Sequence, residues 1–336
     1  MVLKKFYSFC LLLFIISCKT TNTKENQRIT GFALGTSYSI TYSNLSFSSE
    51  RLIKDVDSII GVINKSMSTY IPDSDISKIN MGDSLLQVDK HFEKVYQTAS
   101  IVWNKTDGYF DPTVGALVNA YGFGPETTSN IVSDEMIKEI LKYTGWNKTN
   151  LTSKKTVQKK HTKLFFDFNA LAKGYAVDLI ADHLRSRGID SFLVEIGGEI
   201  VAQGLNQKTK TPWKIAIDDP EQGENRNFIK LISLKDIAIA TSGNYRKFKI
   251  NKSTGSRSVH SINPKNGNSF PTEVLSASVM APTCMIADAY ATALMVMPFE
   301  DSKALIEAED DLEAYWILET NDGGIKEVFS TGFSSE

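Results

Sequence analysis

Two side chains near the C-terminal end of the sequence could hold a metal ion. Asp288 and Thr292 are four residues apart within a helix expected over residues 283–297, so a carboxylate and a hydroxyl share one helical face. Oxygen ligands of this kind suit a hard cation such as Mg²⁺ if a backbone carbonyl completes the site. A simpler interpretation has Asp288 complementing the helix dipole and Thr292 packing against a neighbour. Spacing alone favours the simpler interpretation.

Lys173 and His260 carry the other groups that could do chemistry. Lys173 lies in the first turn of a helix expected over residues 170–187, where the helix dipole disfavours a cation. An anion such as a phosphate, bound at the same helix end, would account for this placement. His260 could donate or accept a proton near neutral pH, but it also fits an ordinary polar position in a strand. Each of these signals is weak when taken alone.

The composition excludes several classes of protein and site. A net charge of −2 leaves no basic excess to neutralise phosphates, so no nucleic acid is expected as a partner. The cysteines are Cys10, Cys18 and Cys284, and the first two fall in an N-terminal segment with targeting features. One cysteine in the remaining domain excludes an intrachain disulfide and a Cys-rich zinc site. A bound metal would therefore be a hard cation with oxygen ligands.

The elements that must position these residues show no steady βαβ alternation, which favours an α+β fold of mixed sheets with packed helices. Strands are expected at residues 38–42, 164–168, 192–196, 199–203, 213–217, 237–240, 246–250 and 275–280. Helices are expected after the capping residues 48–49, at residues 89–103, 170–187 and 283–297, and once more before two final strands. Residues 107–125 hold four glycines and two prolines, which predicts a mostly irregular and functional stretch.

Several short blocks, taken in order along the chain, carry more information than any one residue. They are Gly35-Thr36, residues 67–70 with Ser74 and Asn80, residues 107–113 and 121–124, residues 167–174, residues 197–199, residues 241–245, residues 260–267, and the pair Asp288 and Thr292. This series resembles the FAD:protein FMN transferase family (the ApbE flavin transferases) over essentially all of residues 30–330. The resemblance implies an ApbE-like flavin transferase fold.

The resemblance also implies a reaction and a set of site residues. FAD would be bound as substrate and cleaved with Mg²⁺, FMN would pass to a Ser or Thr hydroxyl of an acceptor protein, and AMP would leave. By position, the residues lining FAD would be Leu34, Tyr70, Asp111, Thr113, Asp167, Lys173 and Ile262. The metal would be held by the carbonyl of Ala170 together with Asp288 and Thr292. Either His260 or Asp288 would accept the proton of the acceptor hydroxyl, and the sequence leaves this choice open.

Three positions depart from the family pattern. Leu34 replaces the usual Met, and Tyr121 replaces a Trp that is common in its block. Asn263 stands where Asp is frequent before a proline, which removes a negative charge near a possible phosphate site. The last change puts an acid role at that position in doubt, but leaves His260 and Asp288 available.

Two other functions are compatible with the same residues. In the first, water takes the place of the acceptor hydroxyl, and the protein is an FAD pyrophosphatase that releases FMN and AMP. In the second, the protein is a non-catalytic FAD-binding lipoprotein, which would retain FAD without releasing AMP and would leave the pair Asp288 and Thr292 unexplained.

The N-terminus has the order of a bacterial lipoprotein signal. Lys4 and Lys5 precede an apolar run over residues 6–16, which is shorter than the roughly 20 residues of a membrane-spanning helix. The run leads to Cys18 in a context that resembles a lipobox, so Cys18 is expected to carry a lipid; an ordinary signal peptide that contains a cysteine is the alternative. The expected organisation is a signal peptide (1–17), a lipid-anchored flexible tether (18–29) and a flavin transferase domain (30–336).

This organisation predicts where the protein acts and on what. It would be exported and lipid-anchored to a bacterial membrane, facing the periplasm. Its macromolecular partners would be exported flavin-acceptor subunits of membrane redox complexes.

Overall fold

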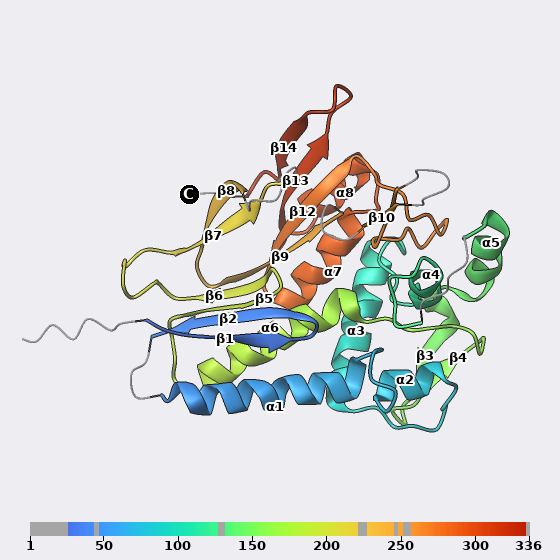
Figure 1. Ribbon diagram of the computed structural model, residues 1–336, viewed down its shortest axis with the longest axis horizontal. Helices are drawn as coiled ribbons and strands as arrows, with labels where there is room; N and C mark the ends of the chain where they lie inside the picture. Colours follow the sequence, from blue (N-terminus) through green and yellow to red (C-terminus); the bar gives the residue numbers. More distant parts are fainter. Residues whose placement is uncertain are drawn as a thin grey trace, which may run out of the picture.

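One eight-stranded sheet runs through the molecule (Figure 1). The computed structural model describes residues 26–43, 47–126, 132–220, 227–244, 248–250 and 257–333. In sheet order the strands are β1 (Gln27–Ala33), β2 (Thr36–Tyr42), β5 (Phe192–Ile196), β6 (Glu199–Gln203), β9 (Ile237–Gly243), β12 (Val274–Ala281), β13 (Glu313–Glu319) and β14 (Ile325–Phe329). Every neighbouring pair is antiparallel.

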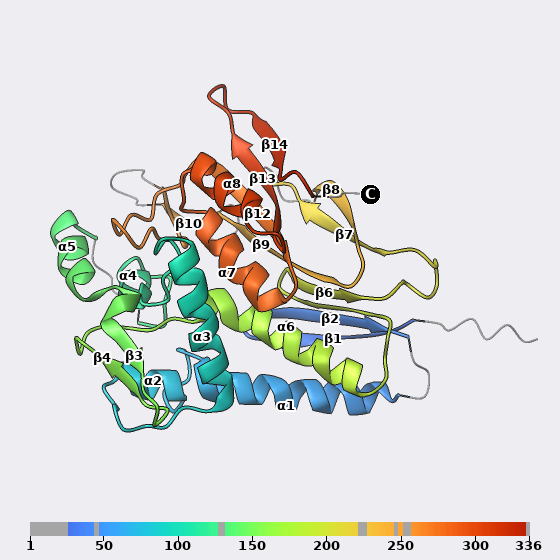
Figure 2. The same cartoon turned by 180° about the vertical axis from the view of Figure 1, so that it is seen from behind.

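Helices cover one face of this sheet and a hairpin covers the other. The helices α6 (Asn169–Ser186) and α7 (Cys284–Leu294) pack on the sheet and on each other, and α1 (Ser49–Met67) and α3 (Lys90–Lys105) lie against them (Figure 2). The opposite face is covered by the hairpin of β7 (Trp213–Asp218) and β8 (Phe228–Leu234).

Strand periodicity divides the apolar residues between two cores. In β13, Ala314 and Trp316 belong to the core under the helices, whereas Tyr315 and Ile317 belong to the core under the β7–β8 hairpin. Successive side chains of a strand point to opposite faces, so a continuous apolar run is needed where both faces are covered. Both cores therefore hold the sheet that carries the site.

Short elements gather beyond one end of α1 and α6, on the right in Figure 1. The helices there are α2 (Asp75–Asn80), α4 (Gly115–Ala120) and α5 (Asp134–Tyr143), with α8 (Phe299–Glu307) above them, and a 3-10 turn spans Trp146–Lys148. The strands are β3 (Thr149–Leu151), β4 (Val157–Lys159), β10 (Phe248–Ile250) and β11 (Arg257–Val259).

The α+β class is confirmed, and most expected elements are present. The strands expected at 192–196 and 199–203 have those bounds in β5 and β6, and Ser48 caps α1 by accepting a hydrogen bond from the amide of Arg51. β1 starts at Gln27, inside the expected tether, because it pairs with β2 along its whole length.

One expectation about local structure was wrong, and one helix was not predicted. Residues 164–168 form no strand but only an isolated bridge at Phe165, because the side-chain amide of Asn80 bonds both the N–H (2.8 Å) and the C=O (2.9 Å) of Phe166. Residues 107–125 are mostly irregular, as expected, but they also contain the short helix α4. That helix has no side-chain cap, and it is stabilised by packing of Leu117 and Ala120 with Ile262.

The signal peptide, Cys18 and the tether up to residue 25 lie outside the described residues. Within the described ranges, no helix has the length and apolar character needed to cross a membrane.

Candidate active site

The site begins where α6 and α7 touch without a side chain between them. A Cβ on Gly174 would lie 2.4 Å from the carbonyl oxygen of Cys284, so only glycine permits this approach. The amide of Gly174 donates to Oδ2 of Asp288 over 3.1 Å. In a regular α-helix, the N–H of Gly174 points toward the carbonyl of Ala170, four residues earlier. Asp288 therefore lies beside the first turn of α6, as the predicted metal site requires.

Two more charged groups lie in the same buried region. The ammonium of Lys173 forms an ion pair with Oε1 of Glu199, whose side chain is only 3% exposed. Burial lowers the pKa of Lys173, but the carboxylates of Asp288 and Glu199 outweigh it and hold that pKa above its ordinary value. Lys173 is therefore a cation at neutral pH.

The two carboxylates experience the opposite effect. Burial raises the pKa of Glu199 to about 7, against the lowering influence of Lys173. Burial likewise raises the pKa of Asp288, while Lys173 and the amide of Gly174 act in the other direction. When both acids are ionised, one ammonium faces two carboxylates, and the excess negative charge suits a cation.

The start of α7 is held by an acid that the sequence reasoning missed. Asp178 of α6 accepts hydrogen bonds from the amides of Cys284 (2.7 Å) and Met285 (2.9 Å), which are unpaired donors of the first helical turn. Burial raises the pKa of Asp178 to about 7. An acidic residue within the largely apolar stretch 175–181 was the available signal. Glu199 stood in a recognised block, but no role was predicted for it.

The donor set fits a hard cation. Thr292 lies one turn after Asp288, and its hydroxyl is 3.5 Å from that of Ser242 on β9. A carboxylate, a hydroxyl and the carbonyl of Ala170 supply oxygen only, which suits Mg²⁺. No cluster of three or more His, Cys, Asp or Glu side chains arranged for a metal occurs among the described residues. A cation here would therefore depend on backbone and hydroxyl oxygens beside Asp288, and the buried, unpartnered Oε2 of Glu199 is consistent with a missing cationic neighbour.

A second group of predicted residues meets around Phe123. The hydroxyl of Tyr70 is 3.4 Å from the carbonyl of Phe123, and the ring of Phe123 meets that of His260 edge-on, with centroids 6.4 Å apart. Lys249 donates to the carbonyl of Gly122 over 2.6 Å. Tyr70 is 59% exposed, so an aromatic face is available to a planar ligand.

Asp167 is close enough to Tyr70 to affect its ionisation. Burial chiefly raises the pKa of Tyr70, and the charge of Asp167 adds to that effect. The amide of Asp167 donates to the carbonyl of Pro112 over 2.8 Å, and its carboxylate accepts from the amide of Asn169 over 2.8 Å. These contacts join the loop before α4 to the start of α6.

Asp111 and Thr113 have buried side chains that are bonded to the protein itself. Asp111 accepts from the amide and hydroxyl of Thr113 at one oxygen, and from Trp103 and the amide of Trp146 at the other. The hydroxyl of Thr113 also accepts from the amide of Gly145 over 2.7 Å. Burial raises the pKa of Asp111 in spite of these donors. Their contact with FAD stays a prediction, and the structure shows them stabilising the loop.

Leu34 and Ile262 occupy different places in the fold. Leu34 has a φ of 51° in the turn between β1 and β2, next to the β5–β6 turn, where the amide of Gly197 donates to the carbonyl of Ser37 over 3.1 Å. Ile262 is buried against α4. The structure thus brings Lys173 and Asp288 together beside Gly174, with Ala170 one turn earlier in α6 and Thr292 one turn later in α7. Separately, it brings Tyr70 and His260 together around Phe123.

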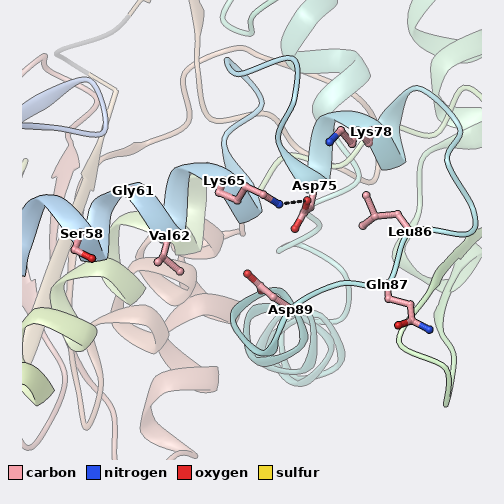
Figure 3. A pocket seen from close by; sticks show the side chains of 9 residues that line it. All are labelled: Ser58, Gly61, Val62, Lys65, Asp75, Lys78, Leu86, Gln87 and Asp89. Carbon is pink, nitrogen blue, oxygen red and sulfur yellow. Dashed lines mark hydrogen bonds and ion pairs between the residues drawn. The ribbon is translucent and has the colours of Figure 1, made fainter.

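An open groove of about 720 Å³ lies elsewhere, along α1, α2 and the chain before α3 (Figure 3). Its charged groups include Lys65 and Asp75, whose ion pair spans 2.8 Å. None of the predicted site residues lines it.

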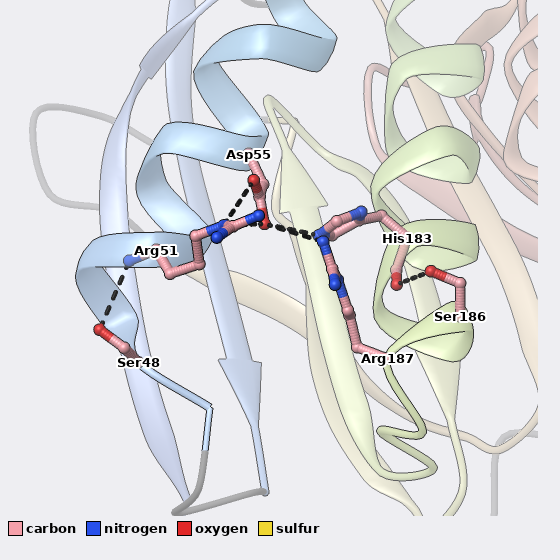
Figure 4. A network of polar contacts seen from close by, with 6 residues as sticks. All are labelled: Ser48, Arg51, Asp55, His183, Ser186 and Arg187. Atoms are coloured by element: carbon pink, nitrogen blue, oxygen red, sulfur yellow. Dashed lines mark hydrogen bonds and ion pairs between the residues drawn. The ribbon is translucent and has the colours of Figure 1, made fainter.

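A polar network at the far end of α6 is structural. Asp55 of α1 accepts from Arg51 over 3.2 Å and contacts His183 of α6 at 3.0 Å, with Arg187 at 3.8 Å (Figure 4). It ties the first turns of α1 to the last turns of α6. His183 is therefore engaged in helix packing at a distance from Asp288, at the opposite end of α6.

Comparison with known proteins adds an independent line of information. Residues 34–316 match the sequence model of the ApbE family. The FAD:protein FMN transferase of Vibrio cholerae serotype O1 is 36% identical over 331 residues, which cover 96% of this chain and 95% of that protein. The FAD:protein FMN transferase of Haemophilus influenzae is 33% identical, with 88% and 87% covered.

Solved structures agree with these sequence matches. The flavin transferase ApbE from Vibrio cholerae superposes with a TM-score of 0.82 at 36% identity, covering 92% of this chain and 98% of that one. The apo form of the flavinyl transferase ApbE from Pseudomonas stutzeri has a TM-score of 0.81 at 29% identity, with 91% and 95% covered.

Proposed function

Because this chain belongs to the ApbE family, we propose that it is an FAD:protein FMN transferase that uses Mg²⁺ to move FMN from FAD to a Ser or Thr hydroxyl of an exported acceptor protein. AMP is the second product. The observation that carries the proposal is the contact between α6 and α7, which holds Asp288 beside the first turn of α6, next to the ion pair of Lys173 with the buried Glu199.

Each site residue has its own role in the proposed reaction. Asp288, Thr292 and the carbonyl of Ala170 would hold Mg²⁺, which would supply positive charge against the charge that develops on the phosphoryl oxygens. The ammonium of Lys173 binds the same oxygens and is kept charged by its two carboxylate neighbours. The ring of Tyr70 is exposed and would contact the flavin.

We assign proton transfer to His260. The acceptor hydroxyl oxygen bonds to the phosphorus of the FMN half, the bond from that phosphorus to the oxygen of the AMP phosphate breaks, and the hydroxyl proton passes to the imidazole of His260. Asp288 is the alternative base, but a carboxylate bound to a cation is a weaker proton acceptor. Contact of His260 with Phe123 places it near Tyr70.

The test is a reaction of the purified protein with FAD, Mg²⁺ and an exported flavoprotein subunit as acceptor. Mass spectrometry should find FMN esterified to a Ser or Thr of the acceptor, together with free AMP. His260→Ala should reduce the rate about 10²- to 10⁴-fold, the usual range for loss of a general base. Asp288→Ala should abolish the response to Mg²⁺.

Other outcomes would indicate a different activity or contradict one part of the proposed mechanism. Free FMN and AMP with an unmodified acceptor would indicate an FAD pyrophosphatase. Retained FAD without AMP would indicate a flavin-binding protein. Undiminished activity in a chelator would contradict the Mg²⁺ requirement, and near-normal transfer by His260→Ala would contradict its role as base.

The site of action is part of the same proposal. A signal peptide over residues 1–17 and a lipid on Cys18 would place the enzyme at a bacterial membrane facing the periplasm. Exported subunits of membrane redox complexes would then be its acceptors.

A further inference from the structure

Glu199 is a buried charged group that the proposed reaction uses only to keep Lys173 charged. It is the first residue of β6, directly after the Gly197-Gly198 turn, and it approaches α6 from the sheet. One carboxylate oxygen pairs with Lys173, while the other is buried and has no hydrogen-bond partner among the described residues. A carboxylate in this setting is costly, because burial removes it from water without full compensation.

Two carboxylates, those of Asp288 and Glu199, are near enough to stabilise the ammonium of Lys173. Both Asp288 and Glu199 stabilise its charge, yet in the described structure the carboxylate within ion-pairing distance is that of Glu199. Lysine is a flexible point charge with several rotamers, so its position depends on its partner. An ammonium bonded to Asp288 would occupy and neutralise the oxygens that a cation needs.

We propose that Glu199 is a positioning residue, which holds the ammonium of Lys173 away from Asp288 and thereby keeps that carboxylate available to a divalent cation. The inference rests on the cation site of the proposed function. It extends that function by explaining how a lysine and a metal-binding aspartate coexist in one buried site.

Removal of the charge of Glu199 should therefore harm metal binding through Lys173. Glu199→Gln keeps the shape of the side chain but leaves Asp288 as the neighbouring carboxylate for the partly exposed ammonium. Asp288 is then the remaining carboxylate whose charge stabilises the ammonium, so Lys173 should move to Asp288. Loss of a supporting group around a metal typically lowers affinity 10- to 100-fold.

The experiment measures Mn²⁺ binding by electron paramagnetic resonance and calorimetry on the full folded protein without acceptor. Wild type should bind Mn²⁺, and Glu199→Gln should bind it at least about tenfold more weakly. The double variant Glu199→Gln with Lys173→Met should recover the wild-type affinity, since no ammonium remains to occupy Asp288. Glu195→Gln, which changes a carboxylate of the same hairpin next to the amide of Gly198, is the matched control and should stay within about twofold of wild type.

Several results would overturn the inference. Wild-type affinity in Glu199→Gln would show that Glu199 does not protect Asp288. Equal weakening in the single and double variants would show that the loss does not pass through Lys173. Unfolding transitions recorded for all variants detect misfolding, and removing both members of a buried ion pair is often neutral for stability. Absence of Mn²⁺ binding in wild type would instead remove the cation site of the proposed function, and this inference with it.

Discussion

At the residue scale, Asp178 shows how a single acid can stabilise the region that carries the site. Its carboxylate accepts hydrogen bonds from the amides of Cys284 and Met285, the first two residues of α7. Hydrogen bonds from a helix N-terminus favour the ionised form, whereas burial favours the neutral one, and burial is the larger effect, since the pKa rises to about 7. The two opposing effects make this residue a source of pH dependence.

The Asp178→Asn variant tests this pH dependence. An acid whose pKa is raised in the folded state contributes stability below its unfolded value, near 4, and loses it as pH rises through about 7. Asparagine does not titrate. The free energy of unfolding of Asp178→Asn, relative to wild type, should therefore increase between pH 4 and pH 7, as measured by urea denaturation at several pH values.

A neighbouring acid provides the control for that series. Asp182 lies one turn further along α6, is 68% exposed and pairs with Arg185. Asp182→Asn should change stability by at most about 0.5 kcal/mol, as for an exposed ion pair. A difference between Asp178→Asn and wild type that stays constant over the same pH range would contradict the prediction.

Sequence reasoning at this scale was accurate where spacing along one helix was sufficient. Asp288 and Thr292 do lie on one helix, and Lys173 does lie near the start of α6. Glu199 and Asp178 were not predicted, because their partners belong to other elements. The pairing of β6 with α6, and of α6 with α7, depends on tertiary structure that local spacing does not encode.

At the element scale, the contact between α6 and α7 depends on Gly174. The Cβ of an alanine there would lie 2.4 Å from the carbonyl oxygen of Cys284 and 2.8 Å from the Cα of Met285. Because these neighbours are backbone, the helices themselves would have to separate. Gly174→Ala should therefore cost about 1–3 kcal/mol of unfolding free energy, as overpacking of a core does, and should weaken Mn²⁺ binding by displacing Asp288.

A second helical glycine supplies the matched control. Gly61 lies in the middle of α1, and nothing approaches the position of its Cβ within 4 Å. Gly61→Ala should stabilise the protein by about 0.5–1 kcal/mol, because alanine restricts the unfolded chain and favours helix. Equal effects of the two substitutions in denaturant titrations would show that Gly174 has no special packing role.

The elements themselves were predictable to different degrees. Short apolar runs on each side of the Gly197-Gly198 turn defined β5 and β6 correctly. Residues 164–168 were predicted as a strand because they form an apolar run. Such a run does not reveal what its backbone bonds, and here the backbone of Phe166 forms hydrogen bonds with the side chain of Asn80 instead of with a strand. Helix α4 was missed because packing against Ile262, rather than local propensity, stabilises it.

At the scale of the whole molecule, the position of β1 bears on the proposed lipid anchor. The start of β1 lies at the end of the molecule opposite α4 and α5 (Figure 1). An anchor attached there would join the molecule at the end away from α4 and α5. The proposed tether from Cys18 to Asn26, about nine residues, would reach roughly 30 Å at full extension and would raise the local concentration of membrane-bound acceptors.

Cys18→Ser tests that benefit. The variant should retain its activity toward a soluble acceptor fragment, because Cys18 precedes every residue assigned to the proposed site. In cells it should modify a membrane-bound acceptor more slowly, as judged by in-gel flavin fluorescence of the acceptor at equal enzyme levels. Equal flavinylation by both forms would remove the proposed advantage of the anchor.

The hydrogen bond between Asp178 of α6 and Cys284 of α7 also bears on when the site can form during synthesis and export. Asp178 and Cys284, which it joins, are 106 residues apart, and the cation ligands Asp288 and Thr292 follow still later in the chain. A growing or translocating chain therefore holds α6 long before it holds the rest of the site. For a protein exported as proposed, flavin chemistry would begin only after the chain as far as Thr292 had crossed the membrane, so the timing of activity would follow from the order of residues.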